Sequence, residues 1–119
     1  IRDRRGVVLI KRDITPDRGK WHLPGGTVHF GERLPSAVRR IARDETGLGV
    51  AVVRCLGVNE AFRRGKTPHN VMATFMVRPN GGALGGSWQG REVRFFRKLP
   101  KNTVPEQARF LLAQKLVGK

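Results

Sequence analysis

Acidic residues and cysteine are both scarce in this chain. Its 119 residues include one cysteine, Cys55, and only 9 Asp and Glu. A single cysteine excludes an internal disulfide and is typical of a reducing compartment, so we expect a cytoplasmic protein. The longest apolar run, residues 6–10, is too short to cross a membrane, and no signal-like segment opens the chain. We therefore expect no membrane partner. Because the chain opens at Ile1, we also expect a short preceding stretch.

Basic residues, by contrast, are abundant. The 24 Lys and Arg give a net charge of +15, which attracts nucleic acid, nucleotides and sugar phosphates by long-range steering. Solubility alone is the alternative explanation, so the charge does not select a function. The sequence has no clear stripe of aromatic residues interleaved with basic ones, as single-strand binders often show. We expect a small phosphorylated substrate; nucleic acid is a partner that the sequence allows but does not favour, and a homodimer is also allowed.

The length suits a single domain over residues 1–119. Apolar patterning predicts strands at 5–12, 49–59, 69–78 and 92–97, with 69–78 central because it is apolar on both faces. Helical spacing predicts a helix over 35–46, which Gly47 ends, and Gly25-Gly26 permits a tight turn before it. Residues 80–90 form a glycine-rich mobile loop or loose hairpin. Strands interspersed with helices indicate a mixed α/β sandwich.

The second predicted helix begins at a capping box. Thr103 and Glu106 have the spacing at which each side chain caps the other's backbone N–H, and Pro105 suits the first turn. The helix carries one apolar stripe, formed by Ala108, Leu111, Leu112 and Leu116.

The residues that carry chemistry lie between Gly25 and Leu48. Glu32 lies on the approach to the first helix, which ends in the adjacent acids Asp44 and Glu45. Carboxylates brought together on one helical stripe invite a hard divalent cation, which takes oxygen ligands. The Gly25-Gly26 turn could bring a backbone carbonyl to the same cation. Taken alone, the two adjacent acids fit the solvated end of an amphipathic helix better.

The complete spacing resembles the Nudix box, G-x5-E-x7-R-E-U-x-E-E-x-G-U, in which U is a bulky apolar residue. Residues 21–26, WHLPGG, also look like the usual entry to this box. The resemblance implies a Nudix-type α/β/α sandwich, with a mixed β-sheet and the box helix against it. Asp44 is a conservative replacement, and Ala42 is smaller than usual. The matching positions are Gly26, Glu32, Arg40, Glu45, Gly47 and Leu48.

The same resemblance implies roles for individual residues. Glu45 is the primary metal ligand, Asp44 a second ligand, and the Gly25 carbonyl a third. Glu32 supports this cluster, and Arg40 orients the carboxylates through charge-assisted hydrogen bonds. The implied cofactor is Mg²⁺, with Mn²⁺ as an alternative; such an ion neutralises phosphate oxygens and can activate water.

Position 41 departs from the family pattern. Ile41 replaces the first glutamate of the box, so one carboxylate is lost and we predict weaker or fewer metal sites. The general base must then come from outside the box, and Glu92 is the best acid by position. The alternative for Glu92 is an ordinary strand carboxylate that pairs with Arg94 or Arg91.

An apolar residue at this position also occurs in family members that hydrolyse GDP-mannose at the sugar carbon, which shows that loss of the acid need not abolish activity. His69 resembles a substrate-site histidine of that subgroup. Asp44 departs from the subgroup's box, and residues 80–90 contain no histidine where the subgroup has a catalytic one. Trp88 is a candidate for base stacking and Arg63 for phosphate contact; their alternatives are domain packing and a solvated surface.

Three functions are consistent with these residues. The leading hypothesis is a metal-dependent Nudix hydrolase that splits a nucleoside diphosphate linked to another group, with a nucleotide sugar as the favoured substrate. The alternatives are an RNA 5′-end pyrophosphohydrolase and a catalytically impaired Nudix-fold module that binds nucleic acid. The retained acids Glu32, Asp44 and Glu45 argue against the impaired module. The missing aromatic stripe argues against RNA, and fold alone does not decide.

Overall fold

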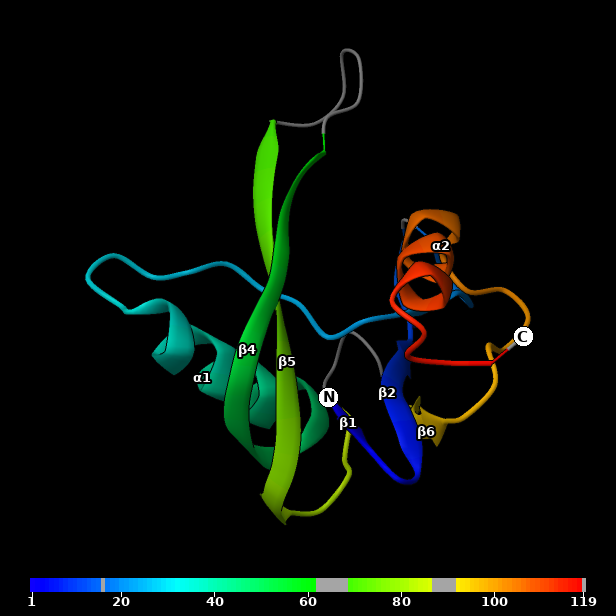
Figure 1. The fold of residues 1–119 in the computed structure, drawn as a ribbon, viewed down its shortest axis with the longest axis horizontal. Coiled ribbons are helices and arrows are strands. Elements are labelled where there is room, and N and C mark those ends of the chain that lie inside the picture. The colour runs from blue at the N-terminus through cyan, green and yellow to red at the C-terminus, as the bar shows by residue number, and fades with distance from the viewer. Residues whose placement is uncertain (16, 62–68, 87–91, 119) are drawn as a thin grey trace.

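The computed structural model describes residues 1–15, 17–61, 69–86 and 92–118. Two antiparallel sheets pack between two helices (Figure 1). The first sheet joins β1 (Arg2–Asp3), β3 (Trp21–His22) and β6 (Glu92–Phe96) to β2 (Gly6–Lys11), which pairs with all three. The second sheet is a long ribbon of β4 (Leu48–Ala61) and β5 (Asn70–Gly82).

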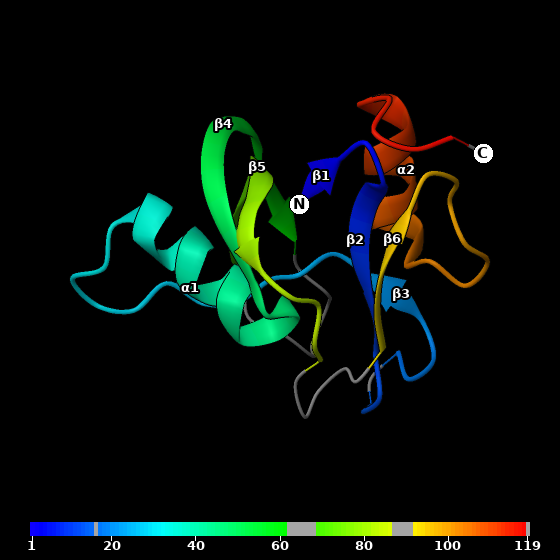
Figure 2. The ribbon, with the colours of Figure 1, turned by 90° about the horizontal axis from the view of Figure 1, so that it is seen from below.

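The helices cover opposite sides of these sheets. Figures 1 and 2 show α1 (Leu34–Thr46) beside the β4–β5 ribbon, and α2 (Pro105–Ala113) on the far side of β2 and β6. This arrangement confirms the predicted α/β/α class. The named strands pair antiparallel, and in the described ranges parallel pairing occurs only at two isolated bridges, Trp21 with Thr103 and Lys98 with Gly118. Neither helix in the part described is long and apolar enough to span a membrane.

Strand β2 is the centre of the core, because both of its faces are covered. Successive side chains of a strand point to opposite faces. Val7 and Leu9 therefore pack with Leu111 of α2, while Val8 packs with Ala42 of α1. All four residues from Val7 to Ile10 are at most 2% exposed. The short apolar run in the sequence thus corresponds to a strand buried on both sides.

The prediction that residues 69–78 form the central strand is wrong. Within the described residues β5 pairs with β4 alone. Only the end of β5 near Val77 reaches the core, whereas Val71 and Met72 are 69% and 48% exposed. The ribbon is longer than the core that covers it, so its apolar residues at the far end stay outside.

The box helix ends where the sequence predicted. Thr46 is fully buried, and its hydroxyl donates to the Ala42 carbonyl and accepts the N–H of Leu48. Gly47 adopts the left-handed conformation at φ 78° and donates its N–H to the Arg43 carbonyl. The left-handed region favours glycine, which has no Cβ. This ending places Asp44 and Glu45 in the last helical turn.

The predicted capping box at Thr103 is wrong. The cap residue of α2 is Val104, with no side-chain capping bond, and the Thr103 hydroxyl donates to the Pro100 carbonyl instead. Residues 102–104 are tied to Trp21, whose N–H bonds to Asn102 and whose carbonyl accepts from Val104. This pairing moves the helix start one residue later, so Glu106 no longer has capping-box spacing. Leu111 is buried as predicted, but Leu116 lies beyond the helix.

The tight position of Gly47 gives a stability prediction. A Cβ at this position would lie 2.3 Å from the Ala83 carbonyl oxygen, in a left-handed conformation. Gly47→Ala should therefore lower the free energy of unfolding by at least about 2 kcal/mol, since the conformation alone costs roughly 1–2 kcal/mol. Gly85→Ala is the matched control, because a Cβ there meets no atom within 4 Å. Urea denaturation measures both, and equal stability of the two variants would contradict the assignment.

Candidate metal and catalytic site

The structure brings Glu45 and Gly25 together. The Gly25 N–H donates to Glu45 Oε1 at 2.8 Å, which fastens the loop after β3 to the last turn of α1. The predicted proximity of the glycine backbone to the box acids is therefore present. Whether the Gly25 carbonyl binds a metal stays a prediction.

Burial is the main influence on the Glu45 carboxyl. It raises the pKa, because a half-buried site disfavours the charged form. The Gly25 N–H and the nearby charges of His22 and Arg12 act in the opposite direction and lower the pKa, while neighbouring Asp44 raises it. Glu45 is thus an acid drawn out of water whose ionised form gains from positive charge in its surroundings.

A second contact, between Arg40 and Glu32, holds the same loop closer to the start of α1. Arg40 binds Glu32 with two N–H groups, Nε to Oε2 at 2.8 Å and Nη2 to Oε1 at 2.9 Å. Nη2 also donates to the Thr27 carbonyl at 2.7 Å. Glu32 Oε1 accepts the His29 N–H as well. Arg40, first, and the His29 N–H, second, lower the pKa of Glu32 from 4.5 to about 2. Arg40 therefore holds Glu32 and the loop backbone.

Ile41 packs against this loop. A Cβ on Gly26 would lie 3.0 Å from Ile41 Cγ1, so the isoleucine lies directly over the glycine. The predicted tight turn at Gly25-Gly26 is wrong: neither glycine has positive φ, and the turn lies at Phe30-Gly31, with Gly31 at φ 78°. Gly26 is needed for close approach. The residue that replaces the box glutamate fills space against the loop that a metal site would use.

Asp44 and Glu45 stay the predicted carboxylate ligands of a cation. Within the described ranges no group of three or more His, Cys, Asp or Glu side chains could hold a metal ion. Glu32 is engaged by Arg40. Mg²⁺ needs no all-protein cage, since it binds through one or two carboxylates together with substrate phosphates and keeps several waters. The two adjacent acids fit such an ion.

A basic cavity of about 500 Å³ opens at the end of β2, where Glu92 begins β6. Glu92 pairs in register with Lys11, and its Oε1 lies 2.6 Å from Arg94 Nη2. The structure therefore contains the Glu92–Arg94 ion pair that the sequence offered as the alternative role of Glu92. The pairing keeps the carboxylate at the cavity edge. The cavity is lined by Lys11, Arg12, Asp13, Arg18, Gly19 and Glu92.

The remaining substrate-binding candidates lie elsewhere or outside the described residues. His69 Nε2 is 2.6 Å from Glu60 Oε2. Glu60 belongs to the ribbon end where Ala61 pairs with Asn70, opposite the end where Leu48 follows α1. A substrate role for His69 therefore stays a prediction. Trp88 and Arg63 lie outside the described residues.

Sequence reasoning named neither Arg12 nor His22 as a site residue. Both charges act on Glu45. His22 pairs with Ile10 across β2 and β3, and Arg12 follows β2 directly. The available signal was position: His22 lies three residues before Gly25, and Arg12 lies at the end of an apolar strand. Their approach to Glu45 depends on strand pairing, which the box spacing does not contain.

Residues 1–114 match the NUDIX domain family, and the chain belongs to this family. A MutT Nudix hydrolase from Burkholderia pseudomallei superposes with a TM-score of 0.79 at 23% identity, covering 98% of this chain and 92% of that one. This likeness shows the shared fold.

Two curated relatives are similar in sequence. An ADP-ribose pyrophosphatase of Methanocaldococcus jannaschii is 37% identical over 97 residues, which cover 80% of this chain and 57% of that protein. The low-salt glycan biosynthesis protein Agl8 of Haloferax volcanii is 44% identical over 62 residues, covering 52% of this chain and 40% of that protein. The chain thus spans about half the length of these relatives.

The clamp at Glu32 gives a pH prediction. Its folded pKa of about 2 lies below the ordinary 4.5, so the ion pair stabilises fully above about pH 4.5, and this stability is lost as the pH falls towards 2. Glu32→Gln should melt at a lower temperature than the native chain at pH 7, and the gap should narrow between pH 5 and pH 3. Glu106→Gln, which removes an exposed carboxylate outside the clamp, is the control. A gap independent of pH would contradict the clamp.

Proposed function

We propose that this chain is a metal-dependent Nudix hydrolase acting on a nucleoside diphosphate linked to another group, with a nucleotide sugar as its substrate. The observation that supports it most is the contact between Gly25 and Glu45. It joins the glycine loop to the acid end of α1, next to the charges of His22 and Arg12. Carboxylates and cations gathered at one place suit a substrate that is itself a metal-bound polyphosphate.

Asp44 and Glu45 are the residues proposed to hold the ion, and Mg²⁺ fits them because both offer hard oxygen ligands. When bound, such an ion neutralises phosphate charge and lowers the pKa of water. Other residues of the chain position these ligands. Glu45 is aimed by the Gly25 N–H, and the Glu32–Arg40 clamp keeps the intervening loop in place.

The basic cavity supports the choice of substrate. Its volume of about 500 Å³ lies within the range of pockets that hold small molecules. Lys11, Arg12 and Arg18 supply positive charge towards phosphate oxygens, and Arg12 also acts on Glu45. Arg12 therefore joins the cavity electrostatically to the proposed metal ligands.

We assign the general base to Glu92. Hydrolysis needs an acceptor for the proton of the attacking water, and Ile41 has removed one box carboxylate that could have served. Glu92 lines the cavity, and its Oε1 lies 2.6 Å from Arg94 Nη2. The water proton would pass to Glu92 while the new oxygen–phosphorus bond forms and the bond from that phosphorus to the bridging oxygen breaks, so that the second phosphate group leaves with the bridging oxygen.

The relatives support the substrate class. The Methanocaldococcus relative is named for ADP-ribose, a nucleoside diphosphate linked to a sugar. A magnesium-dependent hydrolysis panel tests the proposal with nucleotide sugars, dinucleoside polyphosphates, nucleoside triphosphates and 5′-triphosphate RNA. Turnover of nucleotide sugars above the other classes is expected. Preference for the RNA would favour the pyrophosphohydrolase alternative, which the charge of +15 also suits. Absence of hydrolysis on every substrate of the panel would favour the catalytically impaired binding module.

Glu45 gives the first functional prediction. Glu45→Gln keeps the shape but removes the charge, so turnover should fall by about two orders of magnitude or more. Because burial raises the pKa of this carboxyl, its charge costs stability at pH 7, and the metal-free variant should melt no lower than the native chain. Steady-state assays and melting curves measure the two effects. Near-normal turnover would exclude Glu45 as a metal ligand.

Glu92 gives the second functional prediction. Glu92→Gln should lose about two orders of magnitude in kcat while manganese affinity, titrated by electron paramagnetic resonance, stays unchanged. Arg94→Gln is a paired test, since it removes the ion-pair partner of Glu92 and leaves the Glu92 carboxylate in place. A joint loss of turnover and manganese binding would make Glu92 a ligand, and no loss of either would leave it a structural strand residue.

A further inference from the structure

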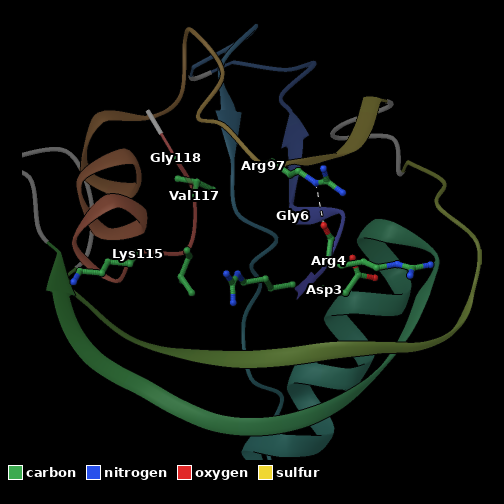
Figure 3. A pocket seen from close by; sticks show the side chains of 9 residues that line it. Asp3, Arg4, Gly6, Arg97, Lys115, Val117 and Gly118 are labelled. Carbon is green, nitrogen blue, oxygen red and sulfur yellow. Dashed lines mark hydrogen bonds between the residues drawn. The ribbon is translucent and has the colours of Figure 1, made fainter.

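A second pocket lies at the opposite end of β2 and β6 from the basic cavity (Figure 3). It measures about 320 Å³, and three separate segments line it: β1 with the turn that leads into β2, Arg97 after β6, and the tail after α2 at residues 115–118. Gly6 lines this pocket and Lys11 lines the basic cavity, at opposite ends of one strand. At the ~3.4 Å rise of an antiparallel strand the two ends are about 17 Å apart.

Positive charge surrounds this pocket. Arg2, Arg4, Arg97 and Lys115 line it, against one acid, Asp3. That acid already has its counter-ion outside the lining, since Asp3 Oδ2 lies 2.7 Å from Arg5 Nη2 and Oδ1 accepts the Arg5 N–H at 2.8 Å. The lining therefore carries four cations against one acid, which is bound by Arg5 and also lies close enough to Arg4 for their charges to interact.

Most of these cations are available to a ligand. In the part of the chain that the structure describes, the side chains of Arg2, Arg4 and Lys115 make no hydrogen bond or ion pair. Figure 3 shows Arg4 beside Arg97 on one side of the pocket and Lys115 on the other. Long flexible side chains on both sides can fold inwards onto an anion.

The backbone that carries them is fixed. Arg97 Nε donates to the Arg4 carbonyl at 3.0 Å, and the Gly118 N–H donates to the Arg97 carbonyl at 2.8 Å. Gly6 permits the closest approach, because a Cβ there would lie 2.1 Å from the Phe96 carbonyl oxygen. The three segments are thus joined before any ligand arrives, which lowers the ordering cost of binding.

We propose that this pocket is a second anion site, separate from the box, which binds a small phosphate-bearing ligand. Guanidinium groups match phosphate oxygens with paired N–H donors, and lysine adds a point charge. An anion would also relieve the mutual repulsion of the four cations. The volume lies at the lower end of small-molecule pockets, so it suits a phosphate or diphosphate group with little more.

Nuclear magnetic resonance of the ¹⁵N-labelled chain in EDTA tests the site without metal or turnover. Pyrophosphate and AMP are titrated separately. The amides of Gly6, Arg97 and residues 115–118 should shift together with one Kd. Tighter binding of AMP identifies a nucleotide as the source of the phosphate, and tighter binding of pyrophosphate identifies the free anion; either result supports the site.

Matched variants separate this site from the general charge of the protein. Arg4→Gln combined with Lys115→Gln should weaken binding about fivefold or more, since two screened ion pairs are removed. Lys101→Gln combined with Arg109→Gln removes the same charge from exposed positions outside both pockets and should change Kd less than twofold. Well-dispersed spectra establish that both double variants are folded.

Three outcomes would overturn the proposal. The first is a set of shifts confined to residues 12–45, which would place the anion at the box. The second is an equal loss of affinity in the control pair, which would leave only nonspecific attraction. The third is single-stranded RNA binding at the same amides far more tightly than either small anion, which would make this face a nucleic-acid surface.

Discussion

The loop between β3 and α1 depends on charge, because burial does little for it. Residues 23–29 form no regular structure, and the apolar side chains Val28 and Phe30 are 44% and 109% exposed. Besides the Gly25 contact with Glu45, the loop is held by Arg40, which binds the Glu32 carboxylate with two N–H groups and the Thr27 carbonyl with one of them. The contact of Gly25 with Glu45 requires a loop in this position. The proposed metal ligands therefore rest on an ion pair at the protein surface.

Replacement of the box glutamate by Ile41 fits this arrangement. An acid at position 41 would face the backbone of Gly26, where the isoleucine now makes apolar contact. Loss of that carboxylate removes repulsion from Asp44 and Glu45 and leaves two acids for a cation. The chain keeps Glu32, Arg40 and Glu45 in contact with their partners, so the departure is local to one side chain.

The box spacing predicted much of this site because its determinants are local. Glu32, Arg40, Glu45 and Gly47 lie within sixteen positions of one another, on one helix and its entry loop. Helical geometry fixes their relative placement. The end of the helix at Gly47 was predictable for the same reason, since a left-handed residue there is a property of the chain itself.

What the sequence did not predict depends on long-range pairing. Arg12 and His22 act on Glu45 because β2 pairs with β3, and the helix cap moved from Thr103 because residues 102–104 bond to Trp21. The central strand was misassigned for a related reason. Residues 69–78 are apolar enough to be buried in a core. How many of them are buried, however, depends on which other segments pack against them.

The pairing of β2 with β6 has a consequence for synthesis of the protein. Val7 lies opposite Phe96, so the innermost strand and its partner come from opposite ends of the chain. During vectorial translation β2 leaves the ribosome well before β6, so its sheet is complete only after the residues between Val7 and Phe96 have been made. Until then one edge of the most hydrophobic strand is open to other nascent chains.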